Sequence, residues 1–367
     1  MSTDASAPAR PSRAAAARAE WARRTNSFTE LAQAVRDAGL NRRRPGVYLV
    51  LFSGLVVALA GAITGMVLLG DSWFQLLIAA ALGVLFTQFA FLGHEAAHRQ
   101  VLASGKANDR FGRVLATFFV GISYAWWMTK HNRHHGNPNQ LGRDPDIAPG
   151  WVSYTVEDVA AATGLQAWIN RRQGWLFFPL LLLLVGVDLH QVSIRRLFEP
   201  GKLAGRATEL VLLGVRFVAY FALVFWLMPV GMAFAFLGVQ FAVFGFYMGI
   251  SFAPNHIGMR VVPHDVKLDF LDKQVLTSRN VSGGWWMTAL MGGLNFQIEH
   301  HLFPGMPRPQ LRQARALVLQ HCRAHDVPYE ENNLFHALGI VVRYLNEVGW
   351  KGRHAFVCPP AAEMGRR

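Results

Sequence analysis

Residues 73–98 read WFQLLIAAALGVLFTQFAFLGHEAAH, and this stretch decides which kind of fold the chain can adopt. It has no charged side chain before residue 94, and an apolar run of about 20 residues is long enough to cross a bilayer as a helix. It ends in His94 and His98, which share one helical face because residues four apart are neighbours there. Neutral imidazole is a common metal ligand, so the stretch predicts a membrane span with metal chemistry at its end.

Three further runs have a similar length and apolar character. The chain is 52% hydrophobic and only 16% charged, and much of the apolar content lies in long runs. We expect membrane spans over residues 46–70, 73–93, 209–230 and 231–254. The predicted fold is an all-α integral membrane protein with four transmembrane helices in two hairpins, with interfacial helices and a cytoplasmic histidine-rich domain for two metals.

The basic residues favour a membrane protein over a nucleic-acid-binding one. The net charge is +13, and nine arginines stand against four acids before residue 45. Arg42, Arg43 and Arg44 directly precede the first span, and a basic flank of this kind marks the cytoplasmic side. No RNA-binding signature accompanies these arginines, so we expect the bilayer and no nucleic acid as a partner.

Two more histidine clusters follow the first. They are His131-Asn-Arg-His134-His135 and Gln297-Ile-Glu-His300-His301. A single zinc site uses about three protein ligands, so seven clustered histidines indicate more than one metal ion.

Two shorter apolar runs decide the topology. If the clusters share one site, residues 111–128 cannot cross the membrane, and we expect an interfacial or re-entrant helix there. The run 174–189 contains Pro179 and Asp188, and we expect that it does not cross either. All three clusters and both termini of this multi-pass protein then lie on the cytoplasmic face.

The same topology divides the chain into three parts. Residues 1–45 are expected to form a basic, largely disordered cytoplasmic segment, with a short interfacial helix over 26–40. Residues 46–305 form the membrane domain in this prediction, and residues 306–367 form a cytoplasmic helical segment.

Three kinds of metal protein remain open at this point. His94-Glu-Ala-Ala-His98 matches the zinc-peptidase pattern HExxH, with Glu95 as general base, but a peptidase leaves most of the other histidines unexplained. A metal transporter is disfavoured because the histidines gather at one face. A binuclear non-haem iron site uses all of them, and it would activate dioxygen beside a water-poor apolar channel.

The sequence motifs around the histidine clusters resemble those of a known family. Residues 93–99 read GHEAAHR, residues 131–139 read HNRHHGNPN and residues 295–304 read NFQIEHHLFP. In this order, and separated by predicted membrane hairpins, they resemble the membrane-bound fatty acid desaturases, and the likeness extends over roughly residues 45–310. Gln297 stands where many members have histidine, which is usual in the acyl-lipid and front-end branch.

The resemblance implies two iron ions, dioxygen as co-substrate and a set of metal ligands. The implied ligands are His94, His98, His131, His134, His135, His300 and His301, with His256 as an eighth at the end of the last span. Residues that could support the imidazoles or the metals are Glu95, Asn255, Gln297, Glu299, Asp144 and Asp146. Two pairs, Trp126-Trp127 and Trp285-Trp286, could line the acyl channel or anchor the chain at the interface.

The implied reaction removes two hydrogens from adjacent methylenes of a fatty acyl chain, carried as an acyl-CoA or within a lipid. No HPGG haem-binding signature occurs in the sequence, so electrons are expected from a separate ferredoxin or reductase-type carrier. A hydroxylase or a ketolase of the same di-iron chemistry stays open as the alternative.

Overall fold

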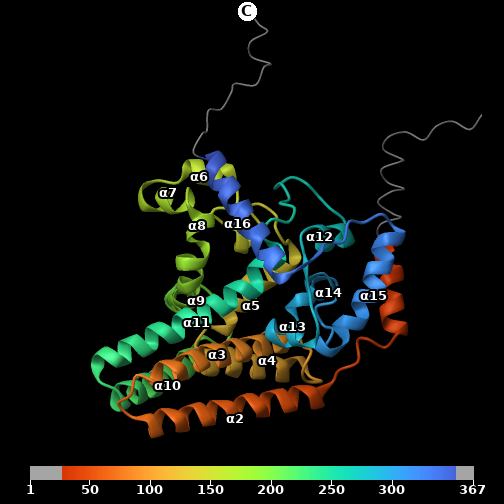
Figure 1. The fold of residues 1–367 in the computed structure, drawn as a ribbon. Helices are drawn as coiled ribbons and strands as arrows, with labels where there is room; N and C mark the ends of the chain where they lie inside the picture. The colour runs from red at the N-terminus through yellow and green to blue at the C-terminus, as the bar shows by residue number, and fades with distance from the viewer. Residues whose placement is uncertain (1–26, 353–367) are drawn as a thin grey trace, which may run out of the picture.

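The computed structural model describes residues 27–352, and the described part is mostly helical (Figure 1). Residues 1–26 and 353–367 lie outside the described residues, so the disorder expected before residue 26 stays a prediction. Residues 27–37 are helical, in agreement with the short helix expected over 26–40.

Four helices of the described part are long and apolar enough to cross a membrane: α2 (Pro45–Leu69), α3 (Gln75–Ala97), α10 (Arg206–Leu227) and α11 (Val230–His256). They confirm the four expected spans as helices, with ends that shift by a few residues. The largest shift extends α3 from the expected end at residue 93 to Ala97, so the first histidine cluster belongs to the helix itself.

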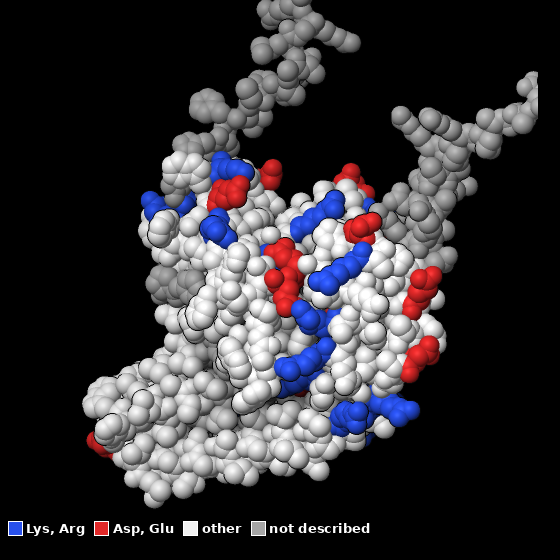
Figure 2. All heavy atoms as spheres, turned by 45° about the vertical axis from the view of Figure 1, so that its right-hand side comes forward, with Lys and Arg blue, Asp and Glu red and all other residues white. Residues whose placement is uncertain are grey.

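Surface composition separates the membrane helices from the rest of the molecule. In the space-filling view the elongated lower part, formed by these helices, carries almost no charged side chain (Figure 2). Large apolar side chains point outward there, and Leu68 and Trp226 are 80% and 81% exposed. A surface of this kind is stable in lipid and unfavourable in water.

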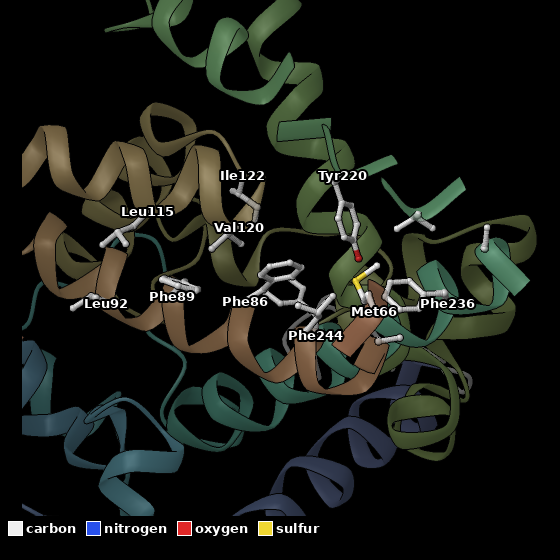
Figure 3. Packing of buried hydrophobic residues seen from close by; sticks show 14 of the residues in the cluster. Met66, Phe86, Phe89, Leu92, Leu115, Val120, Ile122, Tyr220, Phe236 and Phe244 are labelled. Carbon is white, nitrogen blue, oxygen red and sulfur yellow. The ribbon is translucent and has the colours of Figure 1, made fainter. Parts of the chain in front are cut away.

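The apolar core lies between these helices. Side chains of α3 such as Phe86, Phe89 and Leu92 pack there against Phe236 and Phe244 of α11 and neighbouring residues (Figure 3). The core reaches along α3 to Ala96, beside the first histidine cluster. It therefore joins the membrane part to the candidate site.

The region expected to be one helix over 111–128 is broken into two, and the prediction of a single helix is wrong. Helix α4 (Gly105–Arg113) continues into a π-helical turn, η1 (Val114–Val120), and α5 (Tyr124–Gly136) then starts anew. The break falls at Gly121, whose φ of 99° is a left-handed conformation that favours glycine. Ser123 caps α5 by accepting a hydrogen bond from the backbone N–H of Trp126, so the second histidine cluster has a helix of its own.

The run 174–189 is likewise interrupted. It comprises α8 (Gln173–Leu176), the π-helical η3 (Phe177–Leu181) and the start of α9 (Leu182–Phe198), and it is not among the four candidate spans. Helix α9 packs closely on α11 where Gly186 meets Gly245, since a Cβ atom on Gly245 would lie 2.5 Å from the Gly186 nitrogen.

The remaining elements form a polar part next to the ends of α3 and α11 (Figure 1). They are η2 (Pro145–Ile147), α6 (Val156–Ala161), α7 (Gly164–Asn170), α12 (Phe270–Leu276), β1 (Asn280–Ser282), α13 (Trp285–Leu290), η4 (Leu294–Phe296), α14 (Gln297–Leu302), α15 (Arg308–Ala324), β2 (Glu331–Asn333) and α16 (Leu334–Lys351). Strands β1 and β2 pair in parallel, with Asn280 opposite Glu331, so the all-α prediction misses a small sheet. Strands of three residues are too short to show an alternating pattern in the sequence.

Candidate metal centre

Four helices bring the eight predicted metal ligands together: α3, α5, α11 and α14. The ligand atoms fall into two groups, and within each group they lie no more than 4.8 Å apart. The five-histidine group comprises His94, His98, His131, His135 and His300, and the three-histidine group comprises His134, His256 and His301. All eight imidazoles therefore lie where the sequence places them, around one centre with two parts.

In the five-histidine group the ring nitrogens point at one another. The Nε2 atom of His131 lies 3.1 Å from that of His94 and 2.8 Å from that of His98. The Nε2 atoms of His135 and His300 are 3.2 Å apart. Two imidazole nitrogens bound at about 2.1 Å and at right angles on one metal ion would be about 3 Å apart, so the donor set fits a metal ion.

In the three-histidine group the outer nitrogen of His134 faces carboxylates. Its Nδ1 lies 3.0 Å from an oxygen of Asp144, whose carboxylate also accepts the backbone N–H of Asn139. An oxygen of Asp146 lies 3.3 Å from the same Nδ1 atom, and Asp146 also forms an ion pair with Lys130. A carboxylate at Nδ1 keeps a proton there and leaves the Nε2 lone pair free for a metal ion. Asp144 and Asp146 thus both face an imidazole, and Asp144 also caps η2 by accepting a hydrogen bond from the backbone N–H of Asp146.

The other two imidazoles of this group are held in the same way. His256 donates its Nδ1 proton to the backbone carbonyl of Thr277 at 2.9 Å, and His301 donates its Nδ1 proton to Oε1 of Gln274 at 2.9 Å. The Nε2 atom of His301 is buried and has no hydrogen-bond partner among the described residues. A buried lone pair without a donor is costly unless a cation binds to it.

Burial keeps most of these imidazoles neutral. It lowers the pKa of His98 to about 3, and it lowers the pKa values of His131, His135, His300 and His301 well below the usual range, with neighbouring imidazoles adding to the effect. For His134, burial also favours the neutral form, but Asp146 and Asp144 outweigh it and raise the pKa. Neutral imidazole is the form that binds metal ions.

Gln297 completes the three-histidine group. Its Nε2 atom lies 2.9 Å from Nε2 of His256, while its Oε1 accepts a hydrogen bond from Asn255 at 3.1 Å. Within residues 27–352 Asn255 forms no hydrogen bond with an imidazole, and its amide also donates to the carbonyls of Ser251 and Leu294. It therefore orients Gln297, which is the residue that reaches the ligands.

Glu95 does not support an imidazole, and this expectation is wrong. Its two carboxylate oxygens accept hydrogen bonds from the guanidinium of Arg308 at 2.8 and 2.5 Å, and Tyr48 donates to the first of them at 3.2 Å. The pair is almost completely buried. A carboxylate held in this way is not free to act as the general base that the zinc-peptidase alternative requires.

Glu299 also has partners other than histidine. It accepts hydrogen bonds from Asn280 Nδ2 and from the hydroxyl of Tyr329, each at 2.8 Å. Burial raises the pKa of Glu299 to about 7. This side chain connects α14 to β1 and to the segment before β2, so it holds the helix and not an imidazole ring.

The four tryptophans differ from one another. The ring of Trp127 stacks on His131 with centroids 4.3 Å apart, and Trp126 packs against the apolar core. Trp285 and Trp286 are 77% and 53% exposed on α13, which fits interfacial anchoring better than a channel wall. Channel lining stays a prediction for all four tryptophans.

Sequence reasoning missed four residues that hold the site: Gln274, Thr277, Arg308 and Glu209. The carboxylate of Glu209 on α10 accepts hydrogen bonds from the Ser123 hydroxyl at 2.6 Å and from the Ala125 N–H at 3.0 Å, both at the start of α5. It also pairs with Arg113 at 3.1 Å. The signal for Glu209 was present, because it is a lone acid at the edge of a predicted span.

Comparisons with known proteins agree with this geometry. The family described as "Fatty acid desaturase" matches residues 71–333. The Delta(8)-fatty-acid desaturase of Borago officinalis is 28% identical over 91% of this chain and 78% of its own length. An acyl-lipid (9-3)-desaturase of the same plant is 29% identical over 74% of this chain and 63% of its own length. The acyl-lipid 8-desaturase of Rebecca salina is 30% identical, and the match covers 72% of this chain and 62% of that protein.

Proposed function

This chain belongs to the fatty acid desaturase family, and from this premise we propose that it is a di-iron, dioxygen-dependent acyl desaturase of the membrane. It is an oxidoreductase of lipid metabolism with four helices able to span a bilayer. The proposed reaction converts two adjacent methylenes of a fatty acyl chain into a cis or trans double bond. Two electrons from these C–H bonds and two from a carrier, with two further protons, reduce dioxygen to two molecules of water.

The observation that carries the proposal is the pair of histidine groups. The five-histidine group would hold one iron ion and the three-histidine group the other, with Gln297 beside the second. When bound, the two irons would supply dioxygen reduction and hydrogen abstraction from an unactivated C–H bond. The protein fixes the imidazoles, keeps them neutral and excludes water, because the apolar core reaches the first histidine cluster along α3.

The acyl substrate is proposed to approach from the membrane side, as an acyl-lipid or an acyl-CoA. The relatives named above include two acyl-lipid desaturases, which favours the lipid-linked form. The same names favour desaturation over hydroxylation or ketone formation. We place the active site and both termini on the cytoplasmic side, because Arg42, Arg43 and Arg44 precede α2.

Electrons are proposed to come from a separate acidic protein carrier that docks beside His135, the partly exposed imidazole of the second cluster. Lys273 donates to the carbonyl of Gly136 at 3.2 Å, and Arg133 donates to the carbonyl of Arg143 at 3.4 Å. Within residues 27–352 these three cations, Lys273, Arg133 and Arg143, have no acidic partner. Uncompensated positive charge of this kind steers an acidic partner towards the site.

Few hydrogen bonds separate this surface from the two histidine groups. Gln274, the neighbour of Lys273, donates to the carbonyl of His135 at 3.0 Å and accepts from the ring of His301. It therefore links one residue of each histidine group to the surface helix α12.

The experiment combines metal analysis with product analysis. The purified protein is supplied with acyl-lipid or acyl-CoA, dioxygen and a reduced ferredoxin, and products are examined by mass spectrometry with double-bond localisation. A new double bond, with about two irons per chain, supports the proposal. Hydroxy or keto acids in place of unsaturation would assign the chain to the alternative chemistry.

A further inference from the structure

Arg216 is a charged residue in the middle of a membrane helix. It lies ten residues after Arg206, where α10 begins, which is about 15 Å along a helix that rises 1.5 Å per residue. Its distance from the other end of the helix, Leu227, is similar. A charged side chain at this depth is costly and marks a functional site when it has a defined surrounding.

Arg216 lies against aromatic rings, and no carboxylate of the described residues pairs with it. Its guanidinium carbon lies 4.2 Å from the ring centre of Tyr220 and 4.7 Å from that of Phe86. Within residues 27–352 the side chain forms no ion pair and no hydrogen bond. The cation–π contacts stabilise the charge in part, but the guanidinium N–H groups have no acceptor.

A cavity of about 190 Å³ opens beside this guanidinium. Except for Arg216 itself its walls are apolar or aromatic: Leu59, Ile63, Met66, Leu82, Phe86, Phe118, Phe119, Ala219, Tyr220 and Leu223. Tyr220, Phe86 and Met66 lie close together in the packing view, from three different helices (Figure 3). The hydroxyl of Tyr220 is already engaged with Gln240, so Arg216 is the one free polar group of the wall among the described residues.

An apolar cavity with one unpaired cation fits an amphiphile with one anionic end. A carboxylate accepts two parallel hydrogen bonds from a guanidinium, and the resulting pair is neutral overall in the apolar region. A phospholipid phosphate lies at the membrane surface and would have to sink by about half of the span to reach Arg216. The carboxylate of an unesterified fatty acid also starts at the membrane surface, but it can take up a proton and sink as a neutral acid, whereas a phosphodiester stays charged.

We propose that this cavity binds the carboxyl end of a long-chain fatty acid, with the carboxylate paired to Arg216 and the rest of the chain leaving along the apolar wall into the bilayer. The site is separate from the histidine groups, because Phe86 precedes His94 by eight residues on α3, or about 12 Å. It does not depend on the desaturase reaction. It gives the protein a means to bind the free acid of its own lipid class on the helix that carries the first histidine cluster.

The test uses the full chain in nanodiscs of phosphatidylcholine and a C16 fatty acid that carries a photoreactive diazirine on its chain. We expect labelled peptides from α2, α3, η1 or α10, and competition by palmitic acid but not by hexadecanol. Arg216→Gln should lower this labelling about tenfold, whereas Arg216→Lys, which keeps the charge, should retain a larger part of it. The exposed Arg323→Gln is the matched control and should change nothing.

A second variant separates loss of the site from loss of the fold. Ile63→Trp keeps Arg216 and fills the cavity from α2, so it should also abolish labelling while thermal melting and iron content stay as in the unmodified protein. Equal competition by hexadecanol, or unchanged labelling of Arg216→Gln, would overturn the proposal. Competition by phosphatidylglycerol but not by palmitic acid would also overturn it, in favour of a lipid phosphate.

Discussion

The two histidine groups are held in position by different means. In the three-histidine group every imidazole has its own acceptor at Nδ1, from Asp144, Thr277 or Gln274. In the five-histidine group the close contacts of the ring nitrogens join one imidazole to another, and Nδ1 of His135 is buried without a partner among the described residues. There the helices are fixed instead, by buried ion pairs at some distance from the rings.

Two ion pairs serve this purpose. Glu95 with Arg308 joins α3 to α15, which follows the third histidine cluster, and Glu209 with Arg113 lies at the start of α5. One group is thus supported ring by ring, and the other is supported through the placement of whole helices. Loss of one hydrogen bond should therefore affect a single imidazole in the three-histidine group, whereas loss of one ion pair should displace several ligands of the five-histidine group at once.

The largest effect is expected from removing a ligand. His135→Ala should abolish desaturation and lower the iron content from about two to about one per chain, because the five-histidine group loses one of its partly exposed ligands. His301→Ala should do the same through the other group. Product analysis and metal analysis test both variants, and His336→Ala, an exposed histidine outside the groups, should leave both quantities unchanged. Full turnover of either ligand variant would refute the assignment.

The next effect concerns helix placement. Glu95→Gln leaves the charge of Arg308 buried without its partner, and breaking a buried pair of this kind costs about 3–5 kcal/mol. We expect a lower melting temperature and a loss of iron from the five-histidine group. The double variant Glu95→Leu, Arg308→Met removes both charges and should recover much of the stability. If Glu95→Gln melts like the unmodified protein, the pair does not hold the helices.

A smaller and more local effect is expected for ring support. Asp144→Asn keeps the size of the side chain but weakens its hold on Nδ1 of His134. Losing an outer partner of this kind typically lowers metal affinity by about 10–100-fold. Iron titration of the apoprotein should show one weakened site and one unchanged site. Equal weakening of both sites would contradict the local character of the three-histidine group.

The smallest effect is expected at the basic surface beside His135, which Arg133, Arg143 and Lys273 form. The double variant Arg143→Glu, Lys273→Glu should slow turnover several-fold with an acidic protein donor at low salt, and the difference should shrink as salt screens the charges. Turnover driven by a small chemical reductant should not change. If instead the KM for the acyl substrate rises with both reductants, these cations bind the substrate head group and not the carrier.

The sequence predicted the spans and the three histidine clusters because both are local patterns, whereas His256 was expected only from the family resemblance. An apolar run of membrane length and histidines at helical spacing can be recognised without knowing what lies across the fold. The helix end at Gly121 also has a local signal, but the length of the apolar run around it concealed the break.

The supports could not be predicted, because they join distant parts of the chain. Glu95 and Arg308 are 213 residues apart, and nothing near Glu95 distinguishes a carboxylate that pairs with arginine from one that faces an imidazole. Thr277 acts through a backbone carbonyl, so its side chain carries no signal. Gln274 lies on the short helix α12, whose position against His135 and His301 depends on the assembled fold.

The most direct test of the central claim is the metal content of the purified, active protein and of one variant from each histidine group. We expect about two irons per chain in the unmodified protein and about one in His135→Ala and in His301→Ala, with dioxygen-dependent formation of a double bond only in the unmodified protein. One zinc ion per chain with no iron, or desaturation that persists in both variants, would contradict it.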